Sequence, residues 1–215
     1  MEAGGAVITR DPEQSKLRIL AAAEMEFAEK GLYGARVDRI AENAQINKRM
    51  LYAYFGDKEC LYKQVLAQVY KRMELIEREI VSSQYTGQTL IRSIICAYFE
   101  FLQNNPSFVN ILMWENLNHG RYLQEIEASR IERSTIHYFV AALEDGRQNG
   151  VFCSEIDPWN TAVSLITTCF ANFSNQHTLS KLFHTDMTNL EIIEQRKQHT
   201  IEMVMAYLCG KNKEE

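Results

Sequence analysis

Residues 37–55, VDRIAENAQINKRMLYAYF, carry the most informative pattern in this chain of 215 residues. In the first part of the stretch, apolar residues recur at i, i+3, i+4 and i+7, the spacing of one helical face: Val37, Ile40, Ala41 and Ala44. After a break at Gln45, Asn47 can cap a second helix whose Leu51 and Phe55 point the same way. Two short helices joined by a tight turn form a helix-turn-helix.

The second helix of this motif exposes side chains that suit DNA. Its exposed set comprises Lys48, Arg49, Met50, Tyr52 and Tyr54, with Lys58 just beyond. Specific binding needs side chains that reach base edges and phosphates, and a helix N-terminus adds a partial positive charge beside a phosphate. A small helical corner with a solvated basic face fits the same pattern, so the pattern alone leaves both interpretations open.

The charge distribution limits where a DNA contact can lie. The net charge is −5, from 23 basic and 28 acidic residues, which argues against indiscriminate binding to nucleic acid. Residues 1–63 are neutral, with ten basic and ten acidic residues, so the remaining 13 basic and 18 acidic residues place the acidic excess in residues 64–215. A DNA contact must therefore be compact and must come from the first part of the chain.

Residues 17–63 resemble the N-terminal DNA-binding domain of the TetR family of transcriptional regulators. The resemblance lies in four segments in fixed order: ILAAA at 19–23, FAEKG at 27–31, Ile40-Ala41, and NKRMLYAYFGDKE at 47–59. It implies a helix-turn-helix DNA-binding domain over residues 10–63 and an effector-binding and dimerisation domain over residues 64–215.

The resemblance also implies roles for individual residues. Asn47 opens the reading helix, and three residues match positions that face the major groove: Lys48, Arg49 and Met50. Three others match positions that hold the DNA backbone: Tyr52, Tyr54 and Lys58. Gln45 stands where the family usually has glycine, and a left-handed backbone there would cost about 1–2 kcal/mol. Arg36 replaces a threonine whose hydroxyl touches phosphate, and its charge could make that contact instead.

The whole chain is predicted to be all-α, with about nine helices. Each of the three prolines follows an Asx residue, which favours a helix start: Asp11-Pro12, Asn105-Pro106 and Asp157-Pro158. No convincing alternating strand occurs. The expected helices cover residues 12–30, 37–44, 48–54, 58–82, 88–104, 106–117, 121–148, 158–180 and 188–209.

The apolar residues of the last two expected helices indicate that these helices either close a core or form half of a two-fold interface. The stretch from Trp159 to Phe173 is apolar around most of the helix, so we expect it to be enclosed. We favour a homodimer interface over a plain core. Its predicted residues are Leu165, Cys169, Ile201, Val204, Met205 and Leu208.

A ligand pocket is expected among the helices of about residues 88–175. Aromatic and soft side chains favour an apolar or aromatic small-molecule effector, although the same residues suit an ordinary core. The predicted lining is Phe99, Met113, Trp114, Phe139, Phe170, Phe173 and His177. The segment from Pro106 to Leu208 is loosely similar to RutR-type pyrimidine-responsive regulators, but its helix after Pro158 offers few groups to bond a pyrimidine, so the ligand is not transferred.

The sequence predicts neither an enzyme nor a membrane protein. It contains no G-x-S-x-G, H-E-x-x-H or glycine-rich phosphate loop, and its five histidines form no ligand pattern, so we expect no cofactor and no metal. Its longest apolar run, residues 94–99, is far short of the ~20 residues of a membrane span. With no export signal and five scattered cysteines, we expect free thiols in the cytoplasm.

Together these observations predict a dimeric TetR-like repressor that binds a pseudo-palindromic operator and is released by a small molecule. Two alternatives stay open. The C-terminal domain could dock a protein partner, or the regulator could activate transcription, with no small-molecule effector in either case. Alternatively, the helix-turn-helix could serve only as a scaffold in a soluble binding protein.

Overall fold

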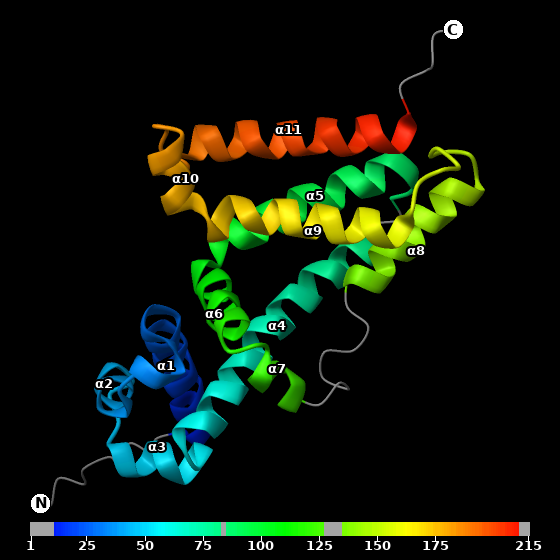
Figure 1. Cartoon of the computed structure of the whole chain (residues 1–215). Coiled ribbons are helices and arrows are strands. Elements are labelled where there is room, and N and C mark those ends of the chain that lie inside the picture. The colour runs from blue at the N-terminus through cyan, green and yellow to red at the C-terminus, as the bar shows by residue number, and fades with distance from the viewer. Residues whose placement is uncertain (1–10, 83–84, 127–134, 211–215) are drawn as a thin grey trace, which may run out of the picture.

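A computed structural model describes residues 11–82, 85–126 and 135–210, and every regular element within these ranges is a helix (Figure 1). The all-α prediction is therefore confirmed. The first three helices form a compact N-terminal group: α1 (Pro12–Gly34), α2 (Val37–Asn43) and α3 (Lys48–Phe55). The long helix α4 (Lys58–Ser82) leaves this group and reaches the C-terminal helices (Figure 1). It continues unbroken through residues 63 and 64, where we placed the domain boundary.

Seven further helices follow α4 within the described residues. They are α5 (Gly87–Asn104), α6 (Pro106–Leu117), α7 (Arg121–Glu125), α8 (Thr135–Gln148), α9 (Pro158–Ser174), α10 (Gln176–Leu182) and α11 (Leu190–Cys209). Helices α5, α6 and α7 pack against α4. Helices α5, α8 and α9 pack against one another, and α11 packs against α5 and α9. Helix α6 also packs against α1 and α9. Figure 1 shows α9 and α11 side by side at the end of the molecule opposite α3.

The described residues contain eleven helices, where about nine were predicted. The helix expected over 158–180 is divided at Asn175, which ends α9 and begins α10. The helix expected over 121–148 is divided because Ile126, after α7, is extended and buried. The middle of that predicted helix, residues 127–134, lies outside the described ranges.

All three prolines begin helices, as predicted, but the side chains of the residues before them make different hydrogen bonds. The side chains of Asp11 and Asp157 cap α1 and α9 by accepting backbone N–H groups. Asn105 makes no side-chain cap for α6. Its amide instead donates to the carbonyl of Phe101 at 2.8 Å, so it bonds the end of the preceding helix.

Gly31 interrupts α1 at the point where we expected that helix to end. Its φ of 65° and ψ of 174° belong to a backbone region that is essentially open to glycine alone. A Cβ at this position would lie 2.7–2.9 Å from ring atoms of Trp114 on α6. The chain then continues in helical form to Gly34. Gly31 therefore permits both the kink and the close approach of α6.

Candidate functional site

The turn between α2 and α3 brings the two short helices together through small and buried side chains. Ala41, Ala44 and Leu51 are at most 4% exposed. Gln45 has a φ of 56°, so this non-glycine residue adopts the left-handed conformation, which the sequence had left open. The next residue, Ile46, donates its N–H to the carbonyl of Ala41 at 3.0 Å and closes the turn.

Helix α3 presents its basic residues to solvent beside a capped N-terminus. The Oδ1 atom of Asn47 accepts the N–H of Met50 at 2.8 Å, so Asn47 orders the first turn. Lys48, Arg49 and Tyr52 are exposed, while Met50 is half-buried. The helix has no acidic residue in its first turn. Its leading end therefore keeps the electrostatic character that favours a phosphate group.

Lys48 already has an anionic partner on α2. Its Nζ lies 2.8 Å from Oδ1 of Asp38, and this hydrogen bond raises the pKa of the lysine. Both side chains are largely exposed, so the pair contributes little to folding stability. The same exposure leaves Lys48 able to exchange the carboxylate for a DNA group.

The remaining predicted DNA-binding residues lie close to the start of α2 or against α1. Lys58 donates to the carbonyl of Ala35 at 3.2 Å, which places its ammonium group beside the backbone that leads into Arg36. Arg36 is exposed at the start of α2, and its backbone N–H donates to Glu26 at 2.9 Å. The half-buried ring of Tyr54 has the ammonium group of Lys16 6.0 Å from its centroid.

A buried carboxylate that the sequence analysis did not single out joins α6 to α4 and α7. Glu115 on α6 is 3% exposed. It accepts the hydroxyl of Tyr62 on α4 at 2.8 Å and the N–H of Leu123 on α7 at 3.1 Å. Burial, together with the bond to Glu115, raises the pKa of Tyr62. A signal existed, because Glu115 continues the i, i+3, i+7 stripe of the buried residues Phe108 and Ile111.

A second buried carboxylate connects three helices at one point. Glu24 of α1 is 8% exposed. Its Oε1 accepts Nη2 of Arg72 on α4 at 2.6 Å and also accepts the hydroxyl of Ser107 on α6. Because these partners are 48 and 83 residues away in sequence, no local pattern could have indicated the cluster.

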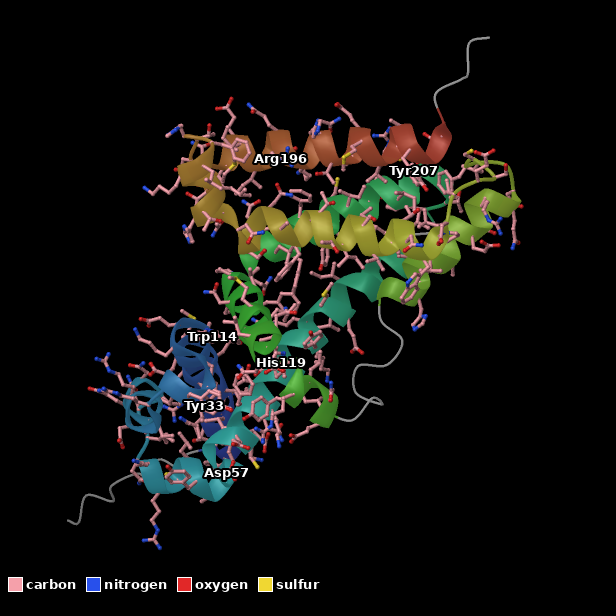
Figure 2. All side chains as sticks on the ribbon, viewed as in Figure 1. Tyr33, Asp57, Trp114, His119, Arg196 and Tyr207 are labelled. Carbon is pink, nitrogen blue, oxygen red and sulfur yellow. The ribbon has the colours of Figure 1, made fainter. Side chains whose placement is uncertain are left out.

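Trp114, predicted as a pocket residue, instead packs against α1. Its Nε1 donates to the carbonyl of Ala28 at 3.3 Å, and its ring covers Gly31. Nearby, the hydroxyl groups of Tyr33 on α1 and Tyr122 on α7 lie 3.4 Å apart. Figure 2 shows Trp114 and Tyr33 where the N-terminal helices meet α6 and α7. We call the contacts made by Glu24, Trp114, Glu115 and Tyr122 the interdomain joint.

The other predicted pocket residues are dispersed in the C-terminal domain. Phe139 is 1% exposed in the core, and Phe99 meets Phe173 edge to face with ring centroids 5.6 Å apart. Phe170 is half-buried, whereas Met113 and His177 are exposed. Only Phe99 of the predicted set lines a cavity of about 260 Å³ among α5, α9, α10 and α11. The full lining of this cavity is Phe99, Asn172, Leu179, Phe183, Met187, Ile193 and Arg196.

The predicted interface residues lie inside the protomer, as the closed core that the sequence left open would also place them. Each is at most 8% exposed in the single chain, because α9 and α11 turn them toward each other and toward α5: Leu165, Cys169, Ile201, Val204, Met205 and Leu208. The outer face of the same helices instead exposes Trp159, Val163, Met203 and Tyr207, at 42–55%. A groove of about 390 Å³ runs along α9 and α11, with Leu165 and Val204 among its lining residues.

Two features are absent from residues 11–82, 85–126 and 135–210. Within them, no three His, Cys, Asp or Glu side chains gather closely enough to hold a metal ion. No helix in the same ranges has the length and apolar character needed to cross a membrane.

The chain is all-helical, and the second helix of its helix-turn-helix is exposed, basic and N-capped. These features define the class of DNA-binding regulators. Two domain models specify the family. The model "Bacterial regulatory proteins, tetR family" matches residues 19–65, and "Tetracyclin repressor-like, C-terminal domain" matches residues 88–204. The chain belongs to the TetR family of transcriptional regulators, whose members of this type are not enzymes.

Individual relatives agree with this assignment. The transcriptional repressor SCO4008 of Streptomyces coelicolor is 37% identical over 149 residues, which cover 68% of this chain and 72% of that protein. The repressor NicS of Pseudomonas putida is 27% identical over 184 residues, covering 85% and 87%. The fold is also similar to that of FadR from Bacillus subtilis, solved with stearoyl-CoA, with a TM-score of 0.67 at 18% identity over 89% of this chain and 98% of that one.

Proposed function

We propose that the protein is a ligand-responsive repressor that binds a pseudo-palindromic operator as a homodimer. The observation that carries the proposal is the exposed, N-capped α3 with Lys48 and Arg49 on its first turn. Two named relatives, SCO4008 and NicS, are repressors. A regulator of this kind acts on chromosomal DNA, which for this protein means the cytoplasm.

Each predicted DNA contact has a role in the proposed complex. Asn47 orders the helix start, and three residues enter the major groove to read bases: Lys48, Arg49 and Met50. Four others hold the backbone on either side: Arg36, Tyr52, Tyr54 and Lys58. The hydrogen bond of Lys58 to the carbonyl of Ala35 supports the separation of backbone-binding from base-reading residues. It places Lys58 beside Arg36 and not beside the first turn of α3. Phosphate contacts set the register, while base contacts select the sequence.

The proposed dimer forms through the outer face of α9 and α11. Exposed Val163, Met203 and Tyr207 supply apolar surface there, and Leu165 and Val204 lie in the groove beneath. A two-fold interface would place two α3 helices on one side of the DNA, in successive major grooves roughly 34–36 Å apart.

Effector binding would release the operator by changing the spacing of the two α3 helices. The interdomain joint supports this idea, since α1 is attached to α6 through Trp114 and Glu24. To turn a mostly bound population into a mostly released one, the effector must prefer the released state by ~5.5 kcal/mol. The FadR structure with stearoyl-CoA supports a small molecule as effector. The loose RutR likeness of residues 106–208 stays a prediction, and no ligand follows from it.

The decisive experiment measures binding of the purified protein to the DNA upstream of its own gene, with a scrambled duplex as control and salt varied. We expect specific affinity at least ~10³-fold above the scrambled duplex, with two protomers per operator by light scattering. Tyr52→Ala and Lys58→Ala should reduce this affinity, while Lys197→Ala on distant α11 should not. Equal, steeply salt-dependent binding of both duplexes, unchanged in these variants, would contradict the proposed operator contact.

A repressor without a small-molecule effector is the second candidate. The exposed apolar side chains of Leu182, Phe183 and Leu190, at 65–73%, favour it, because they offer a surface to a partner. In that case the outer helices would dock a protein, and no small molecule would change operator affinity.

A further inference from the structure

The cavity among α5, α9, α10 and α11 has an unusual combination of walls. Its apolar surface comes from Phe99, Leu179, Phe183, Met187 and Ile193, of which Phe183 is also exposed to solvent. The N–H of Met187 donates to the hydroxyl of Ser180 at 2.9 Å, so the turn between α10 and α11 is held over the cavity. An apolar cavity of about 260 Å³ suits a molecule with one ring or a short chain.

Arg196 is the one charged residue on the cavity wall. It is half-buried near the start of α11, where Figure 2 labels it. Among residues 11–82, 85–126 and 135–210, no carboxylate is recorded within ion-pair distance of its guanidinium group. A guanidinium group keeps its positive charge in proteins, and no carboxylate within those ranges neutralises this one. The cavity therefore favours an anionic ligand.

Asn172 on α9 orients this arginine. Its amide nitrogen donates to the carbonyl of Thr168 at 2.8 Å, which turns its Oδ1 toward α11. That oxygen accepts Nε of Arg196 at 3.1 Å. One edge of the guanidinium group is thereby held by the protein, and the two terminal nitrogens remain for a ligand. Parallel N–H groups of this kind match the two oxygens of a carboxylate.

We propose that this cavity binds a small apolar monocarboxylate, with Arg196 pairing with the carboxylate and Asn172 positioning Arg196. A single cation balances a single negative charge, which favours a carboxylate over a phosphate dianion. The apolar walls then hold the body of the ligand. This proposal deepens the proposed function, on which it rests for one point only: that the occupant of the cavity acts as the effector.

The position of the cavity gives the ligand a route to the DNA-binding domain. The pair Asn172–Arg196 connects α9 to α11, the helices of the proposed dimer face. Helix α9 also packs against α6, whose Trp114 contacts α1. A ligand that draws α9 and α11 together can therefore influence both the dimer and the interdomain joint.

The test uses octanoate and benzoate as probes of chain and ring, each compared with its neutral amide by calorimetry on the full chain. We expect at least one acid to bind at least ~10-fold more tightly than its amide. Arg196→Gln should weaken the acid by about 10- to 100-fold and abolish this preference, because it removes charge-assisted hydrogen bonds. Lys197→Gln is the matched control, since it removes the same charge one residue away, from a side chain that pairs with Glu194.

A second variant keeps the proposal testable if Arg196→Gln unfolds. Asn172→Asp places a carboxylate where the Asn172 oxygen now meets Arg196, so it should compete with the ligand and weaken octanoate or benzoate similarly. Equal binding of acid and amide, an acid preference that survives Arg196→Gln in a folded protein, or no binding of either acid at millimolar concentration would overturn the proposal.

Operator binding with and without the bound acid separates the two proposals. Acid binding that depends on Arg196 and lowers operator affinity supports both. Acid binding that depends on Arg196 but leaves operator affinity unchanged supports the cavity and contradicts its role as the effector site. Specific operator binding with no acid preference supports the DNA-binding function and overturns the cavity proposal.

Discussion

The surface of α3 and the interdomain joint hold their charged groups in opposite ways. Lys48 and Asp38 form an exposed pair that solvent or DNA can replace. Glu24 and Glu115 are at most 8% exposed, and each accepts hydrogen bonds from two partners. An exposed pair costs little to break, whereas an unsatisfied buried group costs about 1–3 kcal/mol. The first region is therefore suited to exchange partners, and the second to keep the two halves of the protomer in fixed register.

The largest effect is expected where the joint is tightest, at Gly31. Gly31→Ala forces a Cβ against the ring of Trp114 and into a backbone conformation that disfavours it, which should destabilise the fold by about 3 kcal/mol or more. Urea unfolding measures this loss. Gly34→Ala is the control, because its Cβ would meet only Lys30 at 3.4 Å. Equal, small effects of the two substitutions would show that the joint tolerates rearrangement.

Alkaline pH tests burial at the joint. Burial and the nearby charge of Glu115 raise the pKa of Tyr70 on α4 to about 12. Because the folded pKa lies above the unfolded value of about 10, this contribution is complete well below pH 10 and declines as pH rises through 10 toward 12. We expect Tyr70 to account for roughly 2 kcal/mol of stability lost between pH 9 and 11.5.

Tyr70→Phe provides the comparison for that measurement, since it removes the titrating hydroxyl but keeps the ring against Phe108. Urea unfolding of both proteins at several pH values should show a shallower decline for the variant. Parallel declines would mean that Tyr70 is not the group responsible.

A smaller and different effect is expected on α3. Arg49→Ala should reduce operator affinity by about 10- to 100-fold if Arg49 reads a base, while the free energy of unfolding stays nearly unchanged because the side chain is exposed. Binding to operator and scrambled duplexes, measured at one salt concentration, distinguishes base reading from phosphate contact. An equal loss on both duplexes would assign Arg49 to the backbone.

The smallest effect concerns the turn between α2 and α3. Gln45→Gly should relieve about 1–2 kcal/mol of left-handed strain and lose about 0.5–1 kcal/mol to the greater entropy of unfolded glycine. The expected net gain is roughly 0.5–1 kcal/mol in thermal or urea unfolding, with operator affinity unchanged. Gln45→Ala should give no gain, since alanine keeps the Cβ. A destabilised glycine variant would indicate that the Gln45 side chain makes a stabilising contact.

The DNA-binding half was predictable because its signals are local. Asn47 caps the helix that follows it, and the apolar spacing of Val37, Ile40 and Ala41 marks the buried face of α2. The helices of the C-terminal half were largely predictable, whereas the packing of its candidate site residues was not. Trp114 is an aromatic residue of the kind that lines ligand pockets, yet its ring packs on Gly31, 83 positions earlier in the sequence. Leu165 and Met205 are apolar residues that would suit a dimer interface, yet both side chains are buried within the protomer.

The sequence by itself determined the all-helical class, the helix-turn-helix and the residues that α3 exposes, because caps, turns and helical periodicity act over a few neighbouring positions. Only the tertiary structure decided which buried groups meet: Glu24 with Arg72 and Ser107, Glu115 with Tyr62, and Arg196 with Asn172. The identity of a side chain does not indicate which residue, distant in sequence, it will contact. Hydrophobic burial is non-directional, so the crossing of the helices selects that partner.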